Sequence, residues 1–264
     1  MKAKSDKPTV SIIMPMYNAE KYIAEAITSV IRQSFTDWKL IVVDDCSEDR
    51  SAEIARRLAD TDTRISICIN DKNHGAAGSR NKGIALADGE WTAFLDCDDI
   101  WRADKLEKQL ALAEKTGAGL IYTSYSLFSD EGGSRKSKNY MVPAEVTYRS
   151  MLRENYIGCS TVMVKRTLLD EHRFSEALHH EDYALWLELL KSGVKAAGCR
   201  QVLADWRITP DSRSAHKISA AKSRWTILRN VEKLPLHTSL SCFAVYAIRG
   251  VIKRYTGYKT VTGA

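Results

Sequence analysis

Residues 91–99 have the sequence WTAFLDCDD, in which a short apolar run is followed at once by three carboxylates. Short apolar runs that are bounded by polar residues are typical of buried strands. We therefore expect a strand over residues 91–95 that ends in Asp96-Cys-Asp-Asp99. Ligands of open α/β sheets bind beyond the carboxyl ends of the strands, so these carboxylates are candidates for a binding site.

Short apolar runs alternate with longer helical patterns on both sides of this segment. Further strands are expected at residues 10–14, 39–43, 65–69, 120–125 and 159–164. Helices are expected at residues 22–31, 75–87, 104–115 and 181–191, and over a segment that ends at about residue 58. This order predicts an α/β fold, with a mainly parallel central sheet flanked by helices.

Helix caps and one loop can also be predicted. Asn18 is expected to cap the first helix, and Ser47 or Ser51 the second, because short polar side chains satisfy the free amides of a first turn. Residues 129–139 (SDEGGSRKSKN) are polar, charged and rich in glycine. That composition predicts an exposed loop.

Composition indicates one globular chain. The 264 residues are 44% hydrophobic and 27% charged, which is enough to bury a core as a single domain. The six cysteines form no C-x-x-C pair, and this argues against a zinc site or a disulfide framework. No apolar stretch is long enough to span a bilayer and the first nine residues are polar, so we expect a cytoplasmic protein.

Polar residues follow four of the expected strands, where a ligand site would form. Carboxylate oxygens suit hard divalent cations, and such a cation can neutralise a diphosphate, so the sequence predicts a metal–nucleotide site. A Rossmann or P-loop site is disfavoured, because Pro15 and Tyr17 stand where a glycine-rich loop should follow the first strand. The four segments are Pro15-Met-Tyr-Asn18, Asp44-Asp-Cys-Ser47, residues 73–81 and residues 96–99.

Five motifs in this order resemble those of the family 2 inverting glycosyltransferases, which have a GT-A fold. The motifs are SIIMPMYN (11–18), VVDDCS (42–47), GSRN (78–81), FLDCDD (94–99) and HEDYALW (180–186). The resemblance runs from about residue 10 to about residue 214. In detail the chain is similar to bacterial enzymes that build teichuronic acid, capsule and lipopolysaccharide chains.

The resemblance implies a site for a nucleotide-activated sugar, with uracil as the expected base and Mg²⁺ or Mn²⁺ as the cofactor. Asp44 is expected to be a structural residue of the strand end. The implied donor-site residues are Pro15, Tyr17 and Asn18 at the base, Asp45 as acceptor from the base imide, Arg80 and Asn81 near the ribose or diphosphate, Asp98 as metal ligand, and Asp96 at the ribose or in the metal shell.

The resemblance also implies a catalytic pair at a helix start. Asp182 would take the proton of the attacking hydroxyl, and Glu181 would position Asp182 or bind the acceptor. Acidic residues are favoured in any first helical turn by the backbone dipole, so a purely structural role is the alternative. Residues 212–216 resemble a late segment that closes over the diphosphate, with Arg213 as a phosphate partner and His216 as a candidate metal ligand.

The C-terminal region is basic. From Arg207 onward there are 11 Lys and Arg residues against 2 Asp and Glu. Residues 240–255 place apolar side chains on one helical face, which either lies on an anionic membrane surface or packs on its own domain. Nucleic acid is not an expected partner, because aromatic residues are not interleaved with the basic ones. The apolar face comprises Phe243, Ala244, Ala247, Ile248, Val251 and Ile252.

These inferences combine into one hypothesis. A single GT-A domain spans residues 1–264, with a nucleotide-sugar half at about 1–125, an acceptor half at about 126–214 and a basic helical tail at about 215–264. It would transfer one sugar from a UDP-sugar to a hydroxyl of a polyprenyl-linked or oligosaccharide acceptor. It would act in the cytoplasm, either in solution or bound to the inner face of the cytoplasmic membrane. Processive synthases carry Q-x-x-R-W, of which only Arg224-Trp225 is present.

Two other functions stay open at this stage. A nucleotidyltransferase would make the activated sugar, but its glycine-rich phosphate loop is missing after the first strand. A non-catalytic nucleotide-binding module recruited to membranes would not need the full acidic set. That set is Asp45, Asp96, Asp98 and Asp182.

Overall fold

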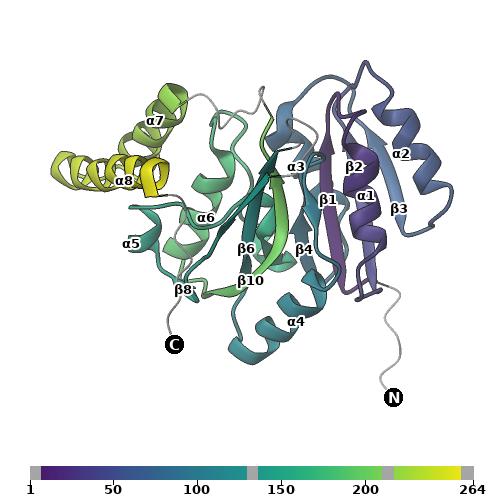
Figure 1. Cartoon of the computed structure of the whole chain (residues 1–264), viewed down its shortest axis with the longest axis horizontal. Coiled ribbons are helices and arrows are strands. Elements are labelled where there is room, and N and C mark those ends of the chain that lie inside the picture. Colours follow the sequence, from purple (N-terminus) through teal and green to yellow (C-terminus); the bar gives the residue numbers. More distant parts are fainter. Residues whose placement is uncertain (1–6, 130–135, 210–216, 257–264) are drawn as a thin grey trace.

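The computed structural model describes residues 7–129, 136–209 and 217–256. Its centre is one mixed sheet with helices on both faces, and α7 and α8 lie together at the end farthest from β3 (Figure 1). The strands are β1 (Val10–Met16), β2 (Trp38–Asp44), β3 (Ile65–Ile69), β4 (Trp91–Phe94), β5 (Ile100–Trp101), β6 (Leu120–Ser129), β7 (Lys136–Tyr140), β8 (Glu145–Val146), β9 (Met163–Lys165) and β10 (Ala196–Arg207).

The sheet order brings the ends of distant strands to one edge. The main path is β3-β2-β1-β4-β9-β6-β10-β5, with β7 paired to β6 and β8 paired to β10. β3, β2, β1 and β4 are parallel, as the alternating pattern predicts. β9 is antiparallel to both β4 and β6, and β6 is parallel to β10. The carboxyl ends of β1, β2, β4, β6 and β10 therefore share one edge of the sheet.

Helices cover the sheet where apolar faces are available. β1 is buried along its whole length, as expected for a central strand covered on both faces. Within the three described ranges, no helix is long and apolar enough to cross a membrane. The helices are α1 (Ile23–Ile31), α2 (Ser51–Ala59), α3 (Gly75–Leu86), α4 (Lys105–Thr116), α5 (Tyr148–Met151), α6 (Glu181–Lys191), α7 (Lys217–Thr226) and α8 (Leu236–Thr256).

The predicted helix caps are wrong, because those side chains join two loops instead. Asn18 adopts a left-handed φ of 46°, and its Oδ1 accepts from the backbone N–H of Glu48 at 2.9 Å. Ser47 Oγ accepts from the N–H of Asn18. Ser51 is the first residue of α2, and its Oγ accepts from the N–H of Ala19 at 2.7 Å. These bonds hold the loop after β1 against the loop after β2.

Two other predicted elements are corrected. Residues 159–164 were expected to form one strand, but Cys159–Thr161 is a 3₁₀ turn and only Met163–Lys165 is a strand. Part of the expected loop at 129–139 is β7, which pairs antiparallel with β6. Residues 130–135 lie outside the described part of the chain.

Candidate active site

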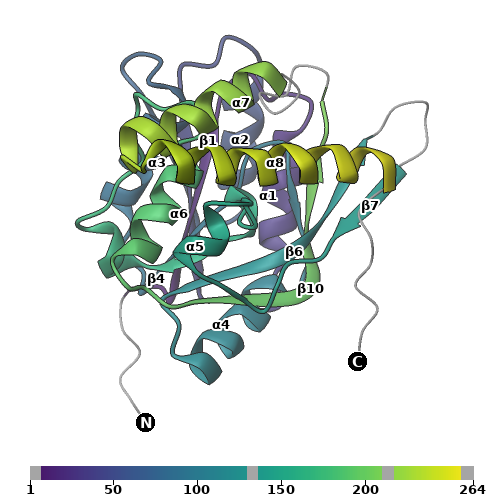
Figure 2. The ribbon, with the colours of Figure 1, turned by 90° about the vertical axis from the view of Figure 1, so that its left-hand side faces the viewer.

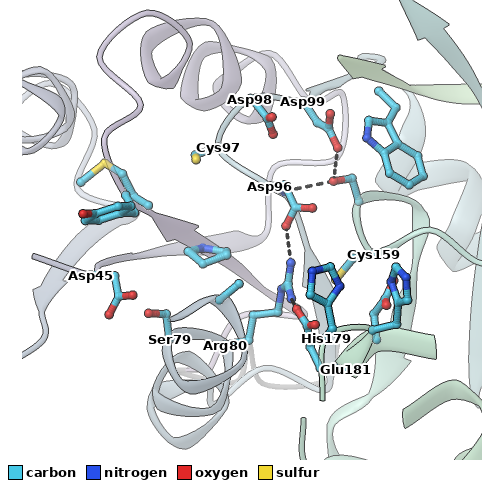
Figure 3. A pocket seen from close by; sticks show the side chains of 18 of the residues that line it. Asp45, Ser79, Arg80, Asp96, Cys97, Asp98, Asp99, Cys159, His179 and Glu181 are labelled. Carbon is cyan, nitrogen blue, oxygen red and sulfur yellow. Dashed lines mark hydrogen bonds and ion pairs between the residues drawn. The ribbon is translucent and has the colours of Figure 1, made fainter. Parts of the chain in front are cut away.

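An open cleft of about 680 Å³ lies where the carboxyl ends of the strands meet the start of α6. Figure 3 shows Arg80 between Asp96 and Glu181, with Asp98 and Asp99 lying beyond Asp96. Eight of the residues singled out from the sequence line this cleft, although their segments are far apart along the chain. They are Pro15, Tyr17, Asp45, Arg80, Asp96, Asp98, Glu181 and Asp182.

Asp45 is held rigidly at the start of α3. It follows β2 directly, and the next residue, Cys46, turns the chain with a left-handed φ of 64°. The Asp45 carboxylate accepts from the backbone N–H groups of His74 and Gly75, both at 2.8 Å, and from Asn70 Nδ2 at 2.7 Å. A carboxylate has about four acceptor positions, so these bonds fix its orientation and leave capacity for one more donor.

Arg80 connects the two sides of the cleft. Its Nη2 lies 2.6 Å from Asp96 Oδ1 at the end of β4, and its Nη1 lies 2.7 Å from Glu181 Oε1 at the start of α6. Its guanidinium also lies over the ring of Phe174, at 5.3 Å from the centroid. Since Arg80 is only 2% exposed, these two carboxylates compensate a buried charge.

Asp98 and Asp99 differ in environment although they are adjacent. Asp99 is buried, and its carboxylate accepts from Ser160 Oγ and from the backbone N–H of Arg207. Burial, with the nearby charges of Asp98 and Asp96, raises the pKa of Asp99 well above its ordinary value. Asp98 lines the cleft, while its backbone carbonyl accepts from Arg207 Nε at 2.9 Å. Asp99 therefore stabilises the loop on which Asp98 is presented.

Asp182 combines access to the cleft with an altered acidity. It lies in the first turn of α6 and is partly exposed, whereas Glu181 is buried. The partial removal of its carboxylate from water, reinforced by the charge of Glu181, raises the pKa of Asp182 to about 6, while Arg80 opposes the shift. A carboxylate of that pKa can accept a proton more readily than an ordinary aspartate.

Some predicted site residues are not brought into the cleft. Asn18 is turned toward Glu48, as described above, and does not line it. Asn81 does not line it either: its Nδ2 donates to the carbonyl of Phe174, and its Oδ1 accepts from the N–H of Phe174. Arg213 and His216 lie outside the described residues.

The donor set fits a hard divalent cation that also binds a ligand's phosphates. The described residues contain no group of three or more His, Cys, Asp or Glu side chains that could hold a metal by themselves. Mg²⁺ is commonly bound by one or two carboxylates together with phosphate oxygens, and Asp98 and Asp96 can supply the two carboxylates. Among the described residues that line the cleft, Arg80 is the only Lys or Arg, so a bound diphosphate needs another source of positive charge.

Several residues that line the cleft are not among those predicted from the sequence. Ser160 Oγ accepts from the N–H of Asp96 at 3.0 Å and donates to Asp99, a link that no local pattern signals. Cys159 lies beside it, and burial raises the pKa of its thiol, so the thiol stays protonated. His179 and His180 line the cleft just before α6, with their rings in edge contact at 5.2 Å. Asn155 and Trp206 complete this wall.

Comparisons of the sequence identify similar proteins over nearly the whole chain. The model of the family described as "Glycosyl transferase family 2" matches residues 11–173. TuaG of Bacillus subtilis, which is named as a glycosyltransferase of teichuronic acid biosynthesis, is 39% identical over 94% of this chain and 98% of its own length. WfgD of Escherichia coli, named as a UDP-Glc:α-D-GlcNAc-diphosphoundecaprenol β-1,3-glucosyltransferase, is 36% identical over 96% of this chain and 98% of its own.

Solved structures share the fold. S. aureus TarS in complex with UDP matches with a TM-score of 0.69 at 20% identity, over 97% of this chain and 75% of that one. The mannosyltransferase PcManGT of Pyrobaculum calidifontis, in complex with GDP-Man and Mn²⁺, also has a TM-score of 0.69, at 18% identity over 96% and 77% of the two chains. At such identities the likeness concerns the fold alone.

Proposed function

The chain belongs to glycosyltransferase family 2, and from this premise we propose that it transfers one sugar from a UDP-sugar to a hydroxyl of a lipid-linked glycan, with inversion at the anomeric carbon. The family and the GT-A fold expected from the five motifs are confirmed. The chain is thus a glycosyltransferase, and bacterial cell-surface polysaccharide is the pathway that its relatives' names indicate. The proposal depends mainly on one observation: Asp182 opens onto the same cleft as Asp45, Asp96 and Asp98.

The nucleotide would bind on the side of β1 and β2. Asp45, held by three N–H donors, has an acceptor position left for the imide N–H of uracil. Pro15 and Tyr17 line the cleft beside it, and Tyr17 is 49% exposed, so its ring is available to cover a base. UDP is the donor nucleotide in the name of WfgD, which supports uracil as the base.

The diphosphate would lie near Asp96 and Asp98. Both terminal nitrogens of Arg80 are engaged by carboxylates, so Arg80 cannot alone balance a diphosphate. Asp98, with Asp96, would hold Mg²⁺ or Mn²⁺, which when bound supplies the positive charge that the departing diphosphate requires. In this proposal Asp96 has two roles, because it also anchors Arg80.

Asp182 would act as the base for the acceptor. As the acceptor oxygen forms its bond to the anomeric carbon, the bond from that carbon to the diphosphate oxygen breaks and UDP leaves with the electron pair. The hydroxyl proton passes to Asp182, whose pKa of about 6 suits a base at neutral pH. Glu181 is unsuited to this role, because Arg80 engages its carboxylate and it is buried.

The test uses the purified chain, a panel of UDP-sugars and GlcNAc-diphosphate on a short alkyl chain, with products detected by mass spectrometry. Asp182→Asn is expected to reduce transfer by about 10²–10⁴-fold, the usual contribution of a general base. Its affinity for UDP with Mn²⁺, measured by calorimetry, should stay within a few-fold of wild type. An equal loss of affinity and transfer would contradict the role of Asp182 as base.

The same assay separates the two rival functions. A nucleotidyltransferase would release pyrophosphate from a nucleoside triphosphate and a sugar phosphate, without using the UDP-sugar. A non-catalytic module would bind UDP and give no product from any donor. Either result would overturn the proposed transfer reaction.

A further inference from the structure

Exposed apolar side chains are concentrated at one end of the molecule. Among the described residues, half of the large hydrophobic side chains that are exposed lie between residues 231 and 248. Such a concentration marks an interaction surface, whereas scattered exposed side chains need no explanation. These four side chains are Val231 (42% exposed), Leu236 (55%), Leu240 (53%) and Ile248 (59%).

Helix α8 has one packed face and one free face. On the packed face Cys242 is buried, and the ring of Phe243 lies edge-on to Trp225 with centroids 5.6 Å apart. Of the two alternatives that the sequence leaves open for the apolar face of this helix, membrane contact and packing on the domain, Phe243 adopts packing. The free face consists of residues spaced three and four apart, so they share one side of the helix. These are Leu236, Leu240, Ala244, Ala247 and Ile248.

The charge around the free face is positive. Between residues 231 and 249 the sequence has one acidic residue, Glu232, which is buried and bonded to Lys191 and Tyr148. Lys222 on α7 and Lys233, three residues before α8, are exposed. The C-terminal region as a whole is basic, with 11 Lys and Arg against 2 Asp and Glu from Arg207 onward, although Arg207 and Arg224 are buried. An apolar stripe flanked by cations is the pattern of a helix that lies in the headgroup region of an anionic bilayer.

Polar contacts fix α8 relative to the cleft. Arg249 is bonded to Glu154 and to the Tyr156 hydroxyl, and Asn155 between them lines the cleft. On α7, Arg224 donates to the carbonyl of Leu152 at 2.8 Å. Figure 2 shows α7 and α8 side by side across this end of the molecule. Docking through α8 would therefore fix the orientation of the cleft relative to the surface that α8 contacts.

We propose that the free face of α8 docks the chain on an anionic lipid bilayer, with the helix lying along the membrane surface. The choice of a bilayer rests in part on the proposed function, since a lipid-linked acceptor is located there. A second copy of this chain is the less suitable partner, because two such faces bring like charges together. The helix contributes apolar side chains that enter the interface, and the flanking lysines contact the lipid phosphates.

Vesicle flotation of the full chain tests this without any substrate. The chain is mixed with vesicles of phosphatidylcholine alone or with about 30% phosphatidylglycerol, the anionic lipid that a basic surface needs. We expect binding only to the anionic vesicles, and a decrease as salt rises. The triple variant Leu236→Ser, Leu240→Ser, Ile248→Ser should bind at least about tenfold more weakly, because it removes most of the apolar area that the bilayer would cover.

Control variants keep the result interpretable. Leu86→Ser removes an apolar side chain that is 50% exposed on α3, and it should bind like the wild type. The double variant Lys222→Glu, Lys233→Glu leaves the apolar face intact, and it should bind anionic vesicles more weakly than the wild type does. If the triple variant bound vesicles as tightly as the wild type, the proposal would be overturned. It would also be overturned if neither protein bound vesicles and the wild type were a dimer that the triple substitution converts to a monomer.

Transfer to the short-chain acceptor separates this proposal from the proposed function. The triple variant should keep that activity, because the cleft is unchanged. Vesicle binding by a chain without transfer activity would remove the proposed function and leave the docking surface. Transfer activity without vesicle binding would support the proposed function and contradict the docking surface.

Discussion

Arg80 Nη1 and Glu181 Oε1 lie 2.7 Å apart, which joins residues 101 positions apart in the sequence within a buried ion pair. Because Nη2 of the same guanidinium binds Asp96, one side chain connects α3, the end of β4 and the start of α6. The charge of Glu181 is thereby compensated, and Asp182 beside it opens onto the cleft. A single arginine thus holds α3 and the end of β4 against the start of α6, where the proposed base lies.

Arg80→Met is expected to destabilise the fold strongly, because it leaves two carboxylates without their buried partner. Loss of one member of a buried pair usually costs about 3–5 kcal/mol of unfolding free energy. The matched control is Arg57→Met, since Arg57 pairs with Glu53 at an exposed site on α2, where a loss of about 0–1 kcal/mol is expected. Urea denaturation of both variants measures the difference, and equal small losses would show that the buried pair contributes little.

The pH dependence of transfer should follow Asp182. Its pKa of about 6 lies above the ordinary aspartate value because of burial and the charge of Glu181. Only the ionised carboxylate accepts a proton, so kcat/KM should rise about tenfold per pH unit below that pKa and level off above it. Glu181→Gln removes a charge that raises the pKa, so the rising limb should move to lower pH. A flat profile between pH 5 and 7 would contradict the role of Asp182.

Asn81 should matter for stability and little for nucleotide binding. Its side chain exchanges two hydrogen bonds with the backbone of Phe174 and so fixes the segment that leads into α6. Asn81→Ala leaves those backbone groups unpaired, which should cost about 1–3 kcal/mol of unfolding free energy. The exposed Asn230→Ala is the control for stability. A large loss of UDP affinity in Asn81→Ala, at unchanged stability, would restore the donor-site role inferred from the resemblance.

Local pattern was sufficient for the elements that carry the chemistry. The bounds of β3 (Ile65–Ile69) and α6 (Glu181–Lys191) agree with the prediction. Both elements are marked by the spacing of their apolar residues and by the polar residues on either side. Parallel strands end at a common edge, so the acids after β2 and β4 could be expected together. The strand β7 could not be predicted, because its sequence KSKNY is polar and pairs with a single neighbour at the sheet margin.

Side-chain direction was the part that the sequence could not supply. Asn18 follows the first strand and Asn81 lies within α3, as expected, but their side chains turn toward Glu48 and Phe174, each of which belongs to a distant segment. Ser160 bonds to Asp99 across 61 positions, and nothing near either residue indicates that contact. Such links depend on how packed elements meet, whereas periodicity describes one element at a time.

Asp98 should control the effect of the metal on nucleotide binding. Asp98→Asn replaces an anionic oxygen with a neutral amide, and a hard divalent cation prefers the carboxylate. Loss of a residue that only hydrogen-bonds to a metal ligand already weakens metal binding about 10–100-fold. Loss of a ligand itself should therefore reduce the Mn²⁺-dependent gain in UDP affinity at least about tenfold. Calorimetry of UDP with and without Mn²⁺ measures this gain, with Asp60→Asn as the control, since Asp60 is exposed at the end of α2 and does not line the cleft. UDP affinity without metal should change little, because Asp45 and Tyr17 contact the base elsewhere in the proposed site. A full Mn²⁺ effect in Asp98→Asn would assign the cation to other ligands.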